Sequence, residues 1–367
     1  MEMSSQRYEV IVVGGGQAGL TMGYFLSRDG REYTILEAAD EPGAAWRKRW
    51  NSLKLFTPAR YSSLPGLPFP GDPDHYPMRD EVASYLSDYA REFELPIRYD
   101  SRVRSLRQAN GLYQAEVDGD VYEAEQVVIA TGPFQAPFAP ALAEGLAPSV
   151  LQLHSSAYRS PATIPHGRVL VVGGGNSGFQ IAEELAASRE VHLAIGSRQT
   201  PLPQRILGRD LFWFLEATGL IHKTVESRIG QRLKDRDTLI GSSPRNIGRR
   251  HGVKLRPRAV GADGSRVRFA DGGEVDVASV IWATGYRPDY SWIEVDIFDD
   301  DGRLLHQRGV TSAPGLYFLG LTWQHTRGSA LIGWVKDDAA FLVDQIGAFR
   351  ANEQRGKHEH ESRALSN

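Results

Sequence analysis

Apolar and polar positions follow one another along the chain in two closely similar blocks. In the first block, apolar runs over 8–13 and 33–36 flank a helix-like stretch over 17–27. In the second, apolar runs over 168–172 and 191–195 flank another helix-like stretch. A short apolar run, an amphipathic stretch and a second run are typical of a strand–helix–strand unit with parallel strands. The pattern therefore predicts two mononucleotide-binding units.

Each block carries a glycine-rich turn between its first strand and its helix. Such a turn lets the backbone approach a pyrophosphate and directs the N-terminus of the helix at it. The residues of the two turns are Gly14, Gly15, Gly16, Gln17, Ala18 and Gly19, and Gly173, Gly174, Gly175, Asn176, Ser177 and Gly178. We therefore predict that each turn binds a dinucleotide.

The residues that follow the second strand of each block differ in charge. Glu37 follows the first, where a carboxylate accepts hydrogen bonds from ribose hydroxyls and repels a 2′-phosphate. Ser197 and Arg198 follow the second, where a hydroxyl and a guanidinium suit that phosphate. The first turn is therefore predicted to bind FAD, and the second to bind NADPH.

Two further apolar strands end in the same three residues, Ala130-Thr131-Gly132 and Ala283-Thr284-Gly285. Matched to the two turns, they indicate paired chain crossings between two nucleotide-binding domains. A last strand over 316–320 and a helix over 329–349 suggest a return to the first domain. The predicted fold is α/β, a glutathione-reductase-like flavoprotein with two dinucleotide-binding domains, the NADP domain inserted into the FAD domain. The predicted parts are 1–158 and 285–350 for FAD, 159–284 for NADP, and a disordered tail over 351–367.

Composition narrows the classes of function. The 367 residues include no cysteine, which excludes disulfides, thiolate metal sites and the dithiol relay of a thioredoxin-reductase-type enzyme. The net charge of −3 gives no reason to expect nucleic acid as a partner. No apolar run reaches the length of a membrane span and no signal peptide is visible, so we expect a cytoplasmic protein. We predict small-molecule partners, among them the substrate and dioxygen, and no metal site. A homodimer is compatible with the sequence.

Several longer motifs resemble those of class B flavoprotein monooxygenases, most closely the short bacterial flavin-containing monooxygenases and plant YUCCA-type enzymes. The resemblance covers nearly the whole chain. The residues that carry it, besides the second glycine turn, are Gly43–Trp46, Arg49–Pro58, Tyr76-Pro77, His154-Ser155 and Tyr158.

This resemblance implies a chemistry and a set of site residues. NADPH would reduce FAD, and reduced flavin would react with dioxygen to a C4a-hydroperoxyflavin that oxygenates a sulfide, amine, ketone or keto acid. Phe56 stands where many members that oxygenate nitrogen have asparagine, so Asn51 or Gln324 would supply the polar catalytic contacts. The residues implied around FAD are Trp46, Leu55, Phe56, Thr57, Val103, Gly320 and Leu331.

Two other functions remain open from the sequence. A flavin-dependent reductase that passes electrons to a protein or a quinone needs the same two cofactors and no thiol. A non-catalytic redox sensor that binds NADPH and FAD needs the same turns. Oxygen incorporation into the product distinguishes a monooxygenase from the reductase. Failure of NADPH to bleach the bound flavin would support the redox sensor.

Overall fold

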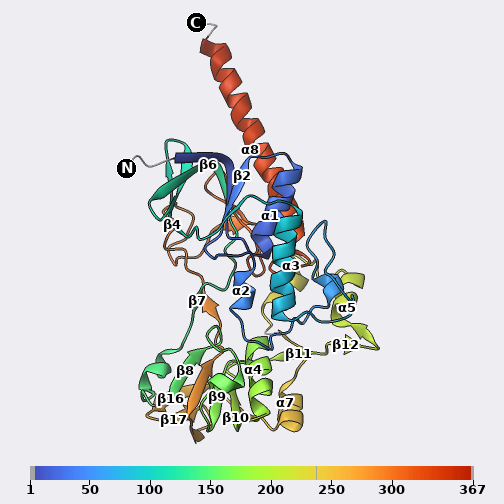
Figure 1. Ribbon diagram of the computed structural model, residues 1–367, viewed down its shortest axis with the longest axis vertical. Helices are drawn as coiled ribbons and strands as arrows, with labels where there is room; N and C mark the ends of the chain where they lie inside the picture. Colours follow the sequence, from blue (N-terminus) through green and yellow to red (C-terminus); the bar gives the residue numbers. More distant parts are fainter. Residues whose placement is uncertain (1–4, 237, 365–367) are drawn as a thin grey trace.

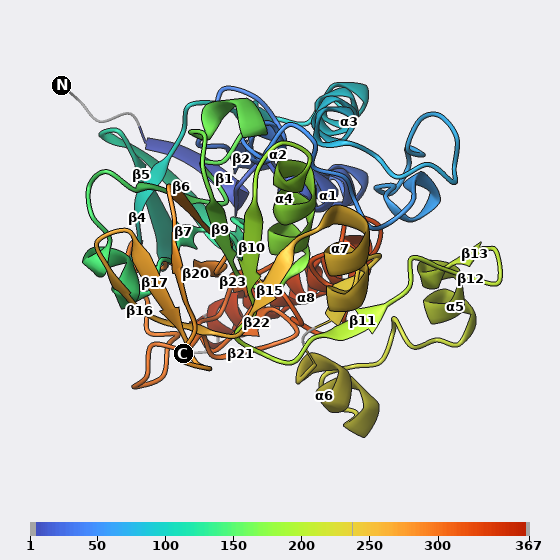
Figure 2. The same ribbon diagram turned by 90° about the horizontal axis from the view of Figure 1, so that it is seen from below.

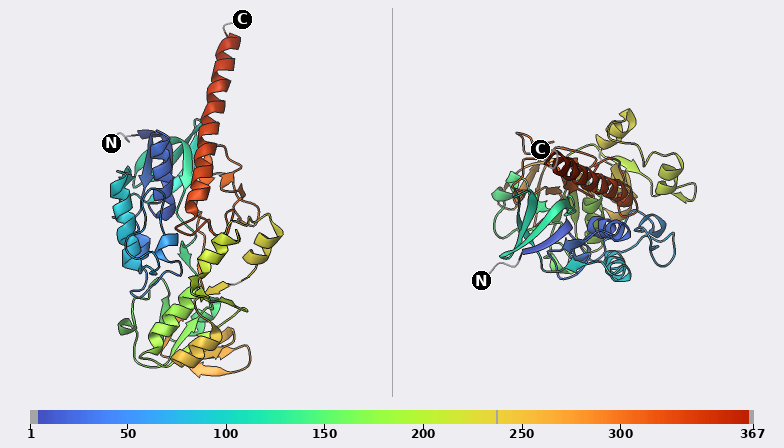
Figure 3. Two further views of the ribbon diagram at one scale, coloured as in Figure 1. Left: turned by 90° about the vertical axis from the view of Figure 1, so that its right-hand side faces the viewer. Right: turned by 90° about the horizontal axis from the view of Figure 1, so that it is seen from above.

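The computed structural model describes residues 5–236 and 238–364, with side chains for 6–236 and 238–351. It has two lobes along its long axis, each built around its own sheet, with a long C-terminal helix rising beyond one of them (Figures 1 and 3). No helix of the described chain is both long enough and apolar enough to span a membrane.

The first lobe is built on a nine-stranded sheet. Val10 and Val12 of the first strand point to the helical face, while Ile11 and Val13 point to the opposite face, because successive side chains of a strand alternate. The strands, in sheet order, are β21 (His306–Gln307), β22 (Val310–Thr311), β23 (Leu316–Phe318), β6 (Asp120–Ile129), β1 (Ser5–Val13), β2 (Tyr33–Leu36) and β3 (Ile97–Arg98), with β4 (Val103–Ala109) and β5 (Leu112–Val117) paired beside β6. The helices on the first face are α1 (Gln17–Arg28), α3 (Arg79–Glu92) and α8 (Val335–Ala364).

The second lobe is built on a parallel five-stranded sheet. Its three central strands are buried along their whole length, which explains why they read as unbroken apolar runs. The order is β15 (Lys254–Arg256), β10 (Val191–Ala194), β9 (Val169–Val172), β19 (Ser279–Trp282) and β8 (Leu151–His154). Beside it lie α4 (Asn176–Ala186), α7 (Pro244–His251) and an antiparallel sheet of β16 (Ala259–Asp263), β17 (Arg266–Phe269) and β18 (Glu274–Asp276).

The chain passes between the lobes twice, as expected for one domain inserted into the sequence of the other. It leaves the first sheet after β6 and returns after β19, and the two passages pair as the antiparallel strands β7 (Ala136–Pro137) and β20 (Tyr286–Arg287). This arrangement confirms the predicted fold class. β8 already belongs to the second sheet, so the chain enters that sheet before the boundary predicted at residue 158.

Residues 199–243, which we call the insertion, lie between β10 and β15. Its described residues, 199–236 and 238–243, stand out on one side of the molecule (Figure 2). The elements are β11 (Thr200–Leu202), β12 (Arg205–Ile206), β13 (Arg209–Asp210), α5 (Leu211–Ala217), α6 (Arg228–Lys234) and β14 (Thr238–Ile240). Elsewhere the chain has the short helices α2 (Ala44–Arg47), η1 (Ala59–Tyr61), η2 (Ala141–Gly145) and η3 (Pro161–Thr163).

The predicted disordered tail over 351–367 is wrong as far as the structure describes it. Helix α8 continues to Ala364, well past the predicted end at residue 349. The extra segment is rich in Ala, Glu, Gln, Lys and Arg, which are strong helix formers, and extending an existing helix needs no new nucleus. Residues 365–367 lie outside the described residues.

Candidate functional site

The first glycine turn is shaped by close backbone contacts. A Cβ on Gly14, whose φ is 110°, would lie 2.7 Å from the carbonyl oxygen of Ala130. A Cβ on Gly19 would overlap the carbonyl oxygen of Gly14. Gly16 differs, since a Cβ there would meet no atom within 4 Å. Two glycines therefore allow close packing, and Gly16 borders open space at the N-terminus of α1.

The second glycine turn repeats this geometry. A Cβ on Gly173 would overlap the carbonyl oxygen of Ala283, and one on Gly178 would overlap that of Gly173. Gly175 again borders open space. The two Ala-Thr-Gly segments thus lie against the two turns in the same way, which accounts for their similarity. Gly132 and Gly285, which end these segments, both have a left-handed backbone, with φ of 72° and 83°.

The groups that face the second glycine of each turn differ in charge. Glu37 accepts hydrogen bonds from the backbone N–H groups of Gly15 and, at 2.8 Å, Ala39. In the second turn this place belongs to Gln199, because a Cβ on Gly174 would lie 2.7 Å from its Nε2 atom. Gln199 is not recognisable from the sequence, because it stands five residues after the end of β10 whereas Glu37 directly follows β2.

Two cations lie at the loop that follows β10. Ser197 and Arg198 are exposed in the loop after β10. Arg258 reaches the same loop, where its Nη2 donates to the carbonyl oxygen of Gly196 at 2.9 Å. Asn176 lies at the start of α4, and its Oδ1 accepts from the N–H of Ile240 at 3.0 Å, which ties the turn to the insertion.

Residues predicted around FAD come together at the first turn. Trp46 donates its indole N–H to Gln17 at 3.1 Å, and Gln17 donates to the carbonyl oxygen of Ala330 at 3.2 Å. A Cβ on Gly320 would lie 2.9 Å from the Cβ of Ala18. The loop between β23 and α8, which carries Leu331, therefore reaches the N-terminus of α1.

Val103 and Thr131 border the same region. Val103 packs partly buried in the core cluster that includes Val13 and Leu36, at the ends of β1 and β2. Thr131 accepts from the side-chain amide of Gln135 at 2.8 Å. The part of each residue that would meet a nucleotide stays a prediction.

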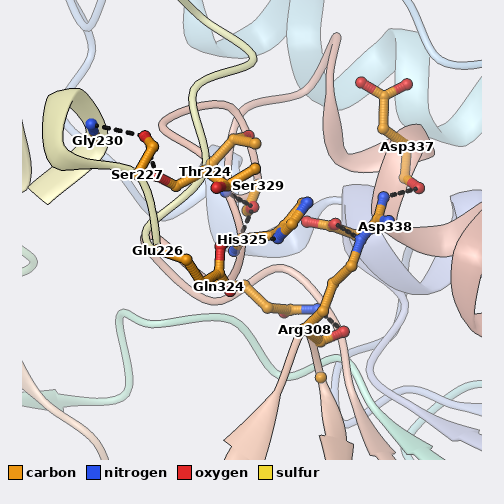
Figure 4. Close-up of polar contacts among 12 residues, drawn as sticks. Thr224, Glu226, Ser227, Gly230, Arg308, Gln324, His325, Ser329, Asp337 and Asp338 are labelled. Carbon is orange, nitrogen blue, oxygen red and sulfur yellow. Dashed lines mark hydrogen bonds and ion pairs between the residues drawn. The ribbon is translucent and has the colours of Figure 1, made fainter.

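The two residues predicted to act in catalysis have different surroundings. Asn51 is exposed, and its backbone N–H donates to the carbonyl oxygen of Arg159 at 2.8 Å. Gln324 is 2% exposed. Its Oε1 accepts from the N–H of Leu321, and its Nε2 donates to the carbonyl oxygen of Arg308 in the turn between β21 and β22 (Figure 4). For both residues a catalytic role stays a prediction.

Phe56 packs in a cluster of four aromatic side chains, which we call the aromatic cluster: Phe56, Tyr61, Phe212 and Trp334. Stacked and tilted ring pairs join them, with centroids 5.9 Å apart for Phe56 and Phe212 and 5.5 Å for Phe212 and Trp334. Leu331 packs against it. Leu55 instead packs on the first core, and Thr57 is buried and bonds to Ser62 at 2.9 Å. The role of Phe212 was not predicted, because it belongs to a distant segment.

Asp210 fastens the insertion to the first lobe. Its carboxylate accepts from Tyr76 at 2.7 Å, from Gln204 at 3.1 Å and from the N–H of Phe212 at 2.7 Å, so it also caps α5. Gln204 donates in addition to the carbonyl oxygen of Phe56 at 2.8 Å.

Replacing Asp210 with alanine should therefore loosen the insertion. Because Asp210 is 8% exposed, its donors would be left without an acceptor, at a cost of about 1–3 kcal/mol. Limited proteolysis should cut Asp210→Ala faster than the parent within residues 199–243. Asp235→Ala, at an exposed position of the same insertion, is the matched control and should be cut at the parent rate.

A second set of contacts joins the insertion to the loop before α8. The N–H of Val225 donates to the carbonyl oxygen of His325 at 2.8 Å, and Thr224 forms a β-bridge with Thr326. Ser329 accepts from the N–H groups of His325 and Thr326, both at 3.0 Å (Figure 4). This loop is therefore held both internally and by the insertion.

His154 lies where the two lobes meet. Its Nε2 donates to the carbonyl oxygen of Gly285 at 2.9 Å, and its Nδ1 accepts from the N–H of Ser156 at 3.1 Å, so the ring is neutral. Its edge meets Tyr286, whose hydroxyl accepts a hydrogen bond from Arg49. Burial lowers the pKa of His154 below its ordinary value, and the charge of Arg49 lowers it further, although the hydrogen bond to Gly285 opposes both.

The lowered pKa of His154 predicts acid sensitivity. The unfolded chain binds the proton more readily than the folded one, so stability is fully present above about pH 6.5 and falls as the pH drops below it. His192 and His306, whose pKa values burial also lowers, act in the same sense. Melting temperatures at pH 7.5 and 5.5 should differ less for His154→Gln than for the parent. An equal difference in both proteins would contradict a role for His154.

Among the side chains that the structure describes, over 6–236 and 238–351, no cluster of three or more His, Asp or Glu is placed to hold a metal ion.

Comparisons with known proteins agree with this geometry. A family model described as pyridine nucleotide-disulphide oxidoreductase matches residues 11–204. An uncharacterized CzcO-like oxidoreductase of Geobacillus kaustophilus is 45% identical over 92% of this chain and 98% of its own. A solved flavin-containing monooxygenase from Stenotrophomonas maltophilia is 32% identical over 94% of this chain and 99% of its own, with a TM-score of 0.79. A probable indole-3-pyruvate monooxygenase of Arabidopsis thaliana, YUCCA1, is 27% identical over 94% and 91%. The resemblance drawn from the motifs is thereby confirmed.

Proposed function

Because the chain belongs to the pyridine nucleotide-disulphide oxidoreductase family and to its flavin-dependent monooxygenases, we propose that it uses NADPH and dioxygen to oxygenate a small organic substrate. FAD, when bound, supplies the electron transfer and the oxygen activation. The observation that carries the proposal is a pair of glycine turns of the same shape, one faced by the carboxylate of Glu37 and the other by the neutral amide of Gln199, in a chain without cysteine.

The residues present fit both cofactors. Gly16 and Gly175 each border space that a side chain would fill, at the N-terminus of a helix of eleven or twelve residues, where an anion is favoured. The indole N–H of Trp50, 3% exposed, has no partner among the described atoms and remains available to a bound group. Glu37 would accept from the ribose of FAD at the first turn.

The second turn suits NADPH. Arg198 and Arg258 bring two cations to the loop after β10, and Gln199 replaces the carboxylate that would repel a 2′-phosphate. An amide can also donate to a phosphate oxygen. We therefore assign NADPH rather than NADH to the second turn.

The electrons must leave the flavin by a route other than a dithiol, since the chain has no cysteine. In a monooxygenase the reacting groups must be kept from water. The aromatic cluster, closed by Asp210 and by the contacts of the loop before α8, is suited to this exclusion. The substrate classes that we propose are sulfides, amines, ketones and keto acids.

Reduction and oxygenation can be tested in one experiment. The FAD-loaded protein is mixed anaerobically with NADPH or with NADH, and flavin bleaching is followed. Oxygen-18 gas is then admitted with thioanisole as the probe substrate. We expect faster bleaching with NADPH and one labelled oxygen atom in the sulfoxide.

Other outcomes would identify the alternatives. Bleaching by NADPH and rapid reduction of an added quinone, with no labelled product from thioanisole, phenylpyruvate or cyclohexanone, would show a reductase. No bleaching by either dinucleotide in a protein that binds both cofactors would show a redox sensor. Either result would overturn the proposed oxygenation.

A further inference from the structure

Arg327 is a cation in the loop between β23 and α8 that lacks an acidic partner among the described residues. The loop around it is fixed, since Ser329 accepts from two backbone N–H groups and Gly328 donates to Thr326 at 3.2 Å. The side chain of Arg327 is partly buried. No residue in the described part of the chain gives it a hydrogen bond or an ion pair.

Other partly buried arginines of this protein have hydrogen-bond partners, which are neutral for Arg49 and Arg159 and acidic for the following two. Arg31 pairs with Glu9 at 2.6 Å, and Arg308, in the turn between β21 and β22, pairs with Asp338 at 3.0 Å. Within the described part of the chain, the contact recorded for the Arg327 guanidinium is with the ring of Trp323, whose centroid is 6.0 Å from its Cζ. Stacking of this kind leaves the guanidinium N–H groups free to donate.

The surroundings of Arg327 are unfavourable for a charge. Burial lowers its pKa, and no neighbouring acid acts in the opposite direction. Keeping a guanidinium in such a place without an anion costs free energy. The side chain is nevertheless only partly buried, so an anion that arrives with a bound molecule can reach it.

The same loop connects this cation to both parts of the predicted site. Ala330 accepts from Gln17 at the first glycine turn, and Leu331 packs on the aromatic cluster. The proposed function assigns the phosphates of the two dinucleotides to the backbone N–H groups of the two turns. The anion left for Arg327 is therefore one that arrives with the substrate.

We propose that Arg327 binds the carboxylate of the substrate, and that the apolar body of that substrate lies against the aromatic cluster. This inference rests on the proposed oxygenase function and narrows its substrate to carboxylic acids with an aromatic or otherwise apolar body. The planar guanidinium offers a carboxylate two parallel N–H groups, which favours a bidentate pair. Arg327 is thus the residue that selects acids over neutral compounds of the same shape.

Calorimetric titration of the FAD-loaded protein with NADP⁺ present tests this directly. Phenylacetate and phenylacetamide serve as probes, since they share a shape and differ in charge. We expect the parent to bind phenylacetate at least tenfold more tightly. Arg327→Met should lose that preference while its affinity for phenylacetamide stays the same, and Arg327→Lys should keep part of it. Arg249→Met, at an exposed position of α7, is the matched control and should bind as the parent does.

Three results would overturn the inference. Equal affinity of the parent for both probes would show that no carboxylate is selected. Loss of FAD or NADP⁺ binding in Arg327→Met would show that the guanidinium serves a dinucleotide. A clear fall in the melting temperature of the ligand-free variant would show a structural role, because removing an unpaired cation should leave that temperature unchanged or raise it. Probe binding needs no turnover, so these results are distinct from a failure of the oxygenation itself.

Discussion

Gly175→Val is expected to keep its FAD and to lose at least about 100-fold in its rate of reduction by low concentrations of NADPH. The valine side chain would enter space that is open in the structure, so the fold has no reason to change. It would, however, occupy the place proposed for the pyrophosphate and separate it from the backbone N–H groups of α4. Losing two hydrogen bonds to a charged group costs about 3–6 kcal/mol, which corresponds to 100-fold or more.

The first turn gives the reciprocal variant. Gly16→Val should fold and lose FAD, while its NADP⁺ affinity stays near that of the parent. Flavin content after purification, NADP⁺ titration and circular dichroism measure the three properties. A Gly175→Val protein that is reduced at the parent rate would contradict the assignment of the second turn. Gly178→Ala is a contrasting control, since its methyl group would overlap the carbonyl oxygen of Gly173 and should disturb the turn itself.

The parts of the fold that the sequence predicted have local signals. A glycine turn, the strand before it and the helix after it lie within about 30 residues, and each needs a distinct residue type for a backbone reason. The two Ala-Thr-Gly segments were also recognisable, because each must approach a glycine of a turn. Gly14 with Ala130, and Gly173 with Ala283, show this approach directly.

The missed parts depend on contacts between distant segments. Phe212 joins Phe56 across more than 150 residues, and Asp210 joins Tyr76 across 134, and no periodicity records such a pairing. In the sequence, Arg327 is only a charged residue in a loop, because the lack of an acidic partner is a property of the packed structure. The C-terminal helix was missed for another reason. Its residues after 350 lack an apolar stripe, so helix propensity is the only local signal that they form a helix.

Gln199→Glu should change the preference of the second turn from NADPH towards NADH. The new carboxylate would face Gly174 as Glu37 faces Gly15, where it could accept from ribose hydroxyls and would repel a 2′-phosphate. Close like charges cost several kcal/mol, so kcat/KM for reduction by NADPH should fall by about 30-fold or more. The value of kcat/KM for reduction by NADH should stay the same or rise.

The ratio of the reduction rates with NADPH and with NADH, measured by anaerobic stopped-flow on the FAD-loaded protein, tests this prediction. Gln199→Ala removes the amide without adding a charge, so it should weaken NADPH binding only modestly. Comparing it with Gln199→Glu separates the effect of losing a hydrogen-bond donor from that of charge repulsion. Arg198→Met should lower the NADPH rate and leave the NADH rate near the parent value, because its guanidinium is assigned to the phosphate alone. If Gln199→Glu kept the parent preference, the charge difference between the two turns would not govern cofactor choice, and Arg198 with Arg258 would have to account for it.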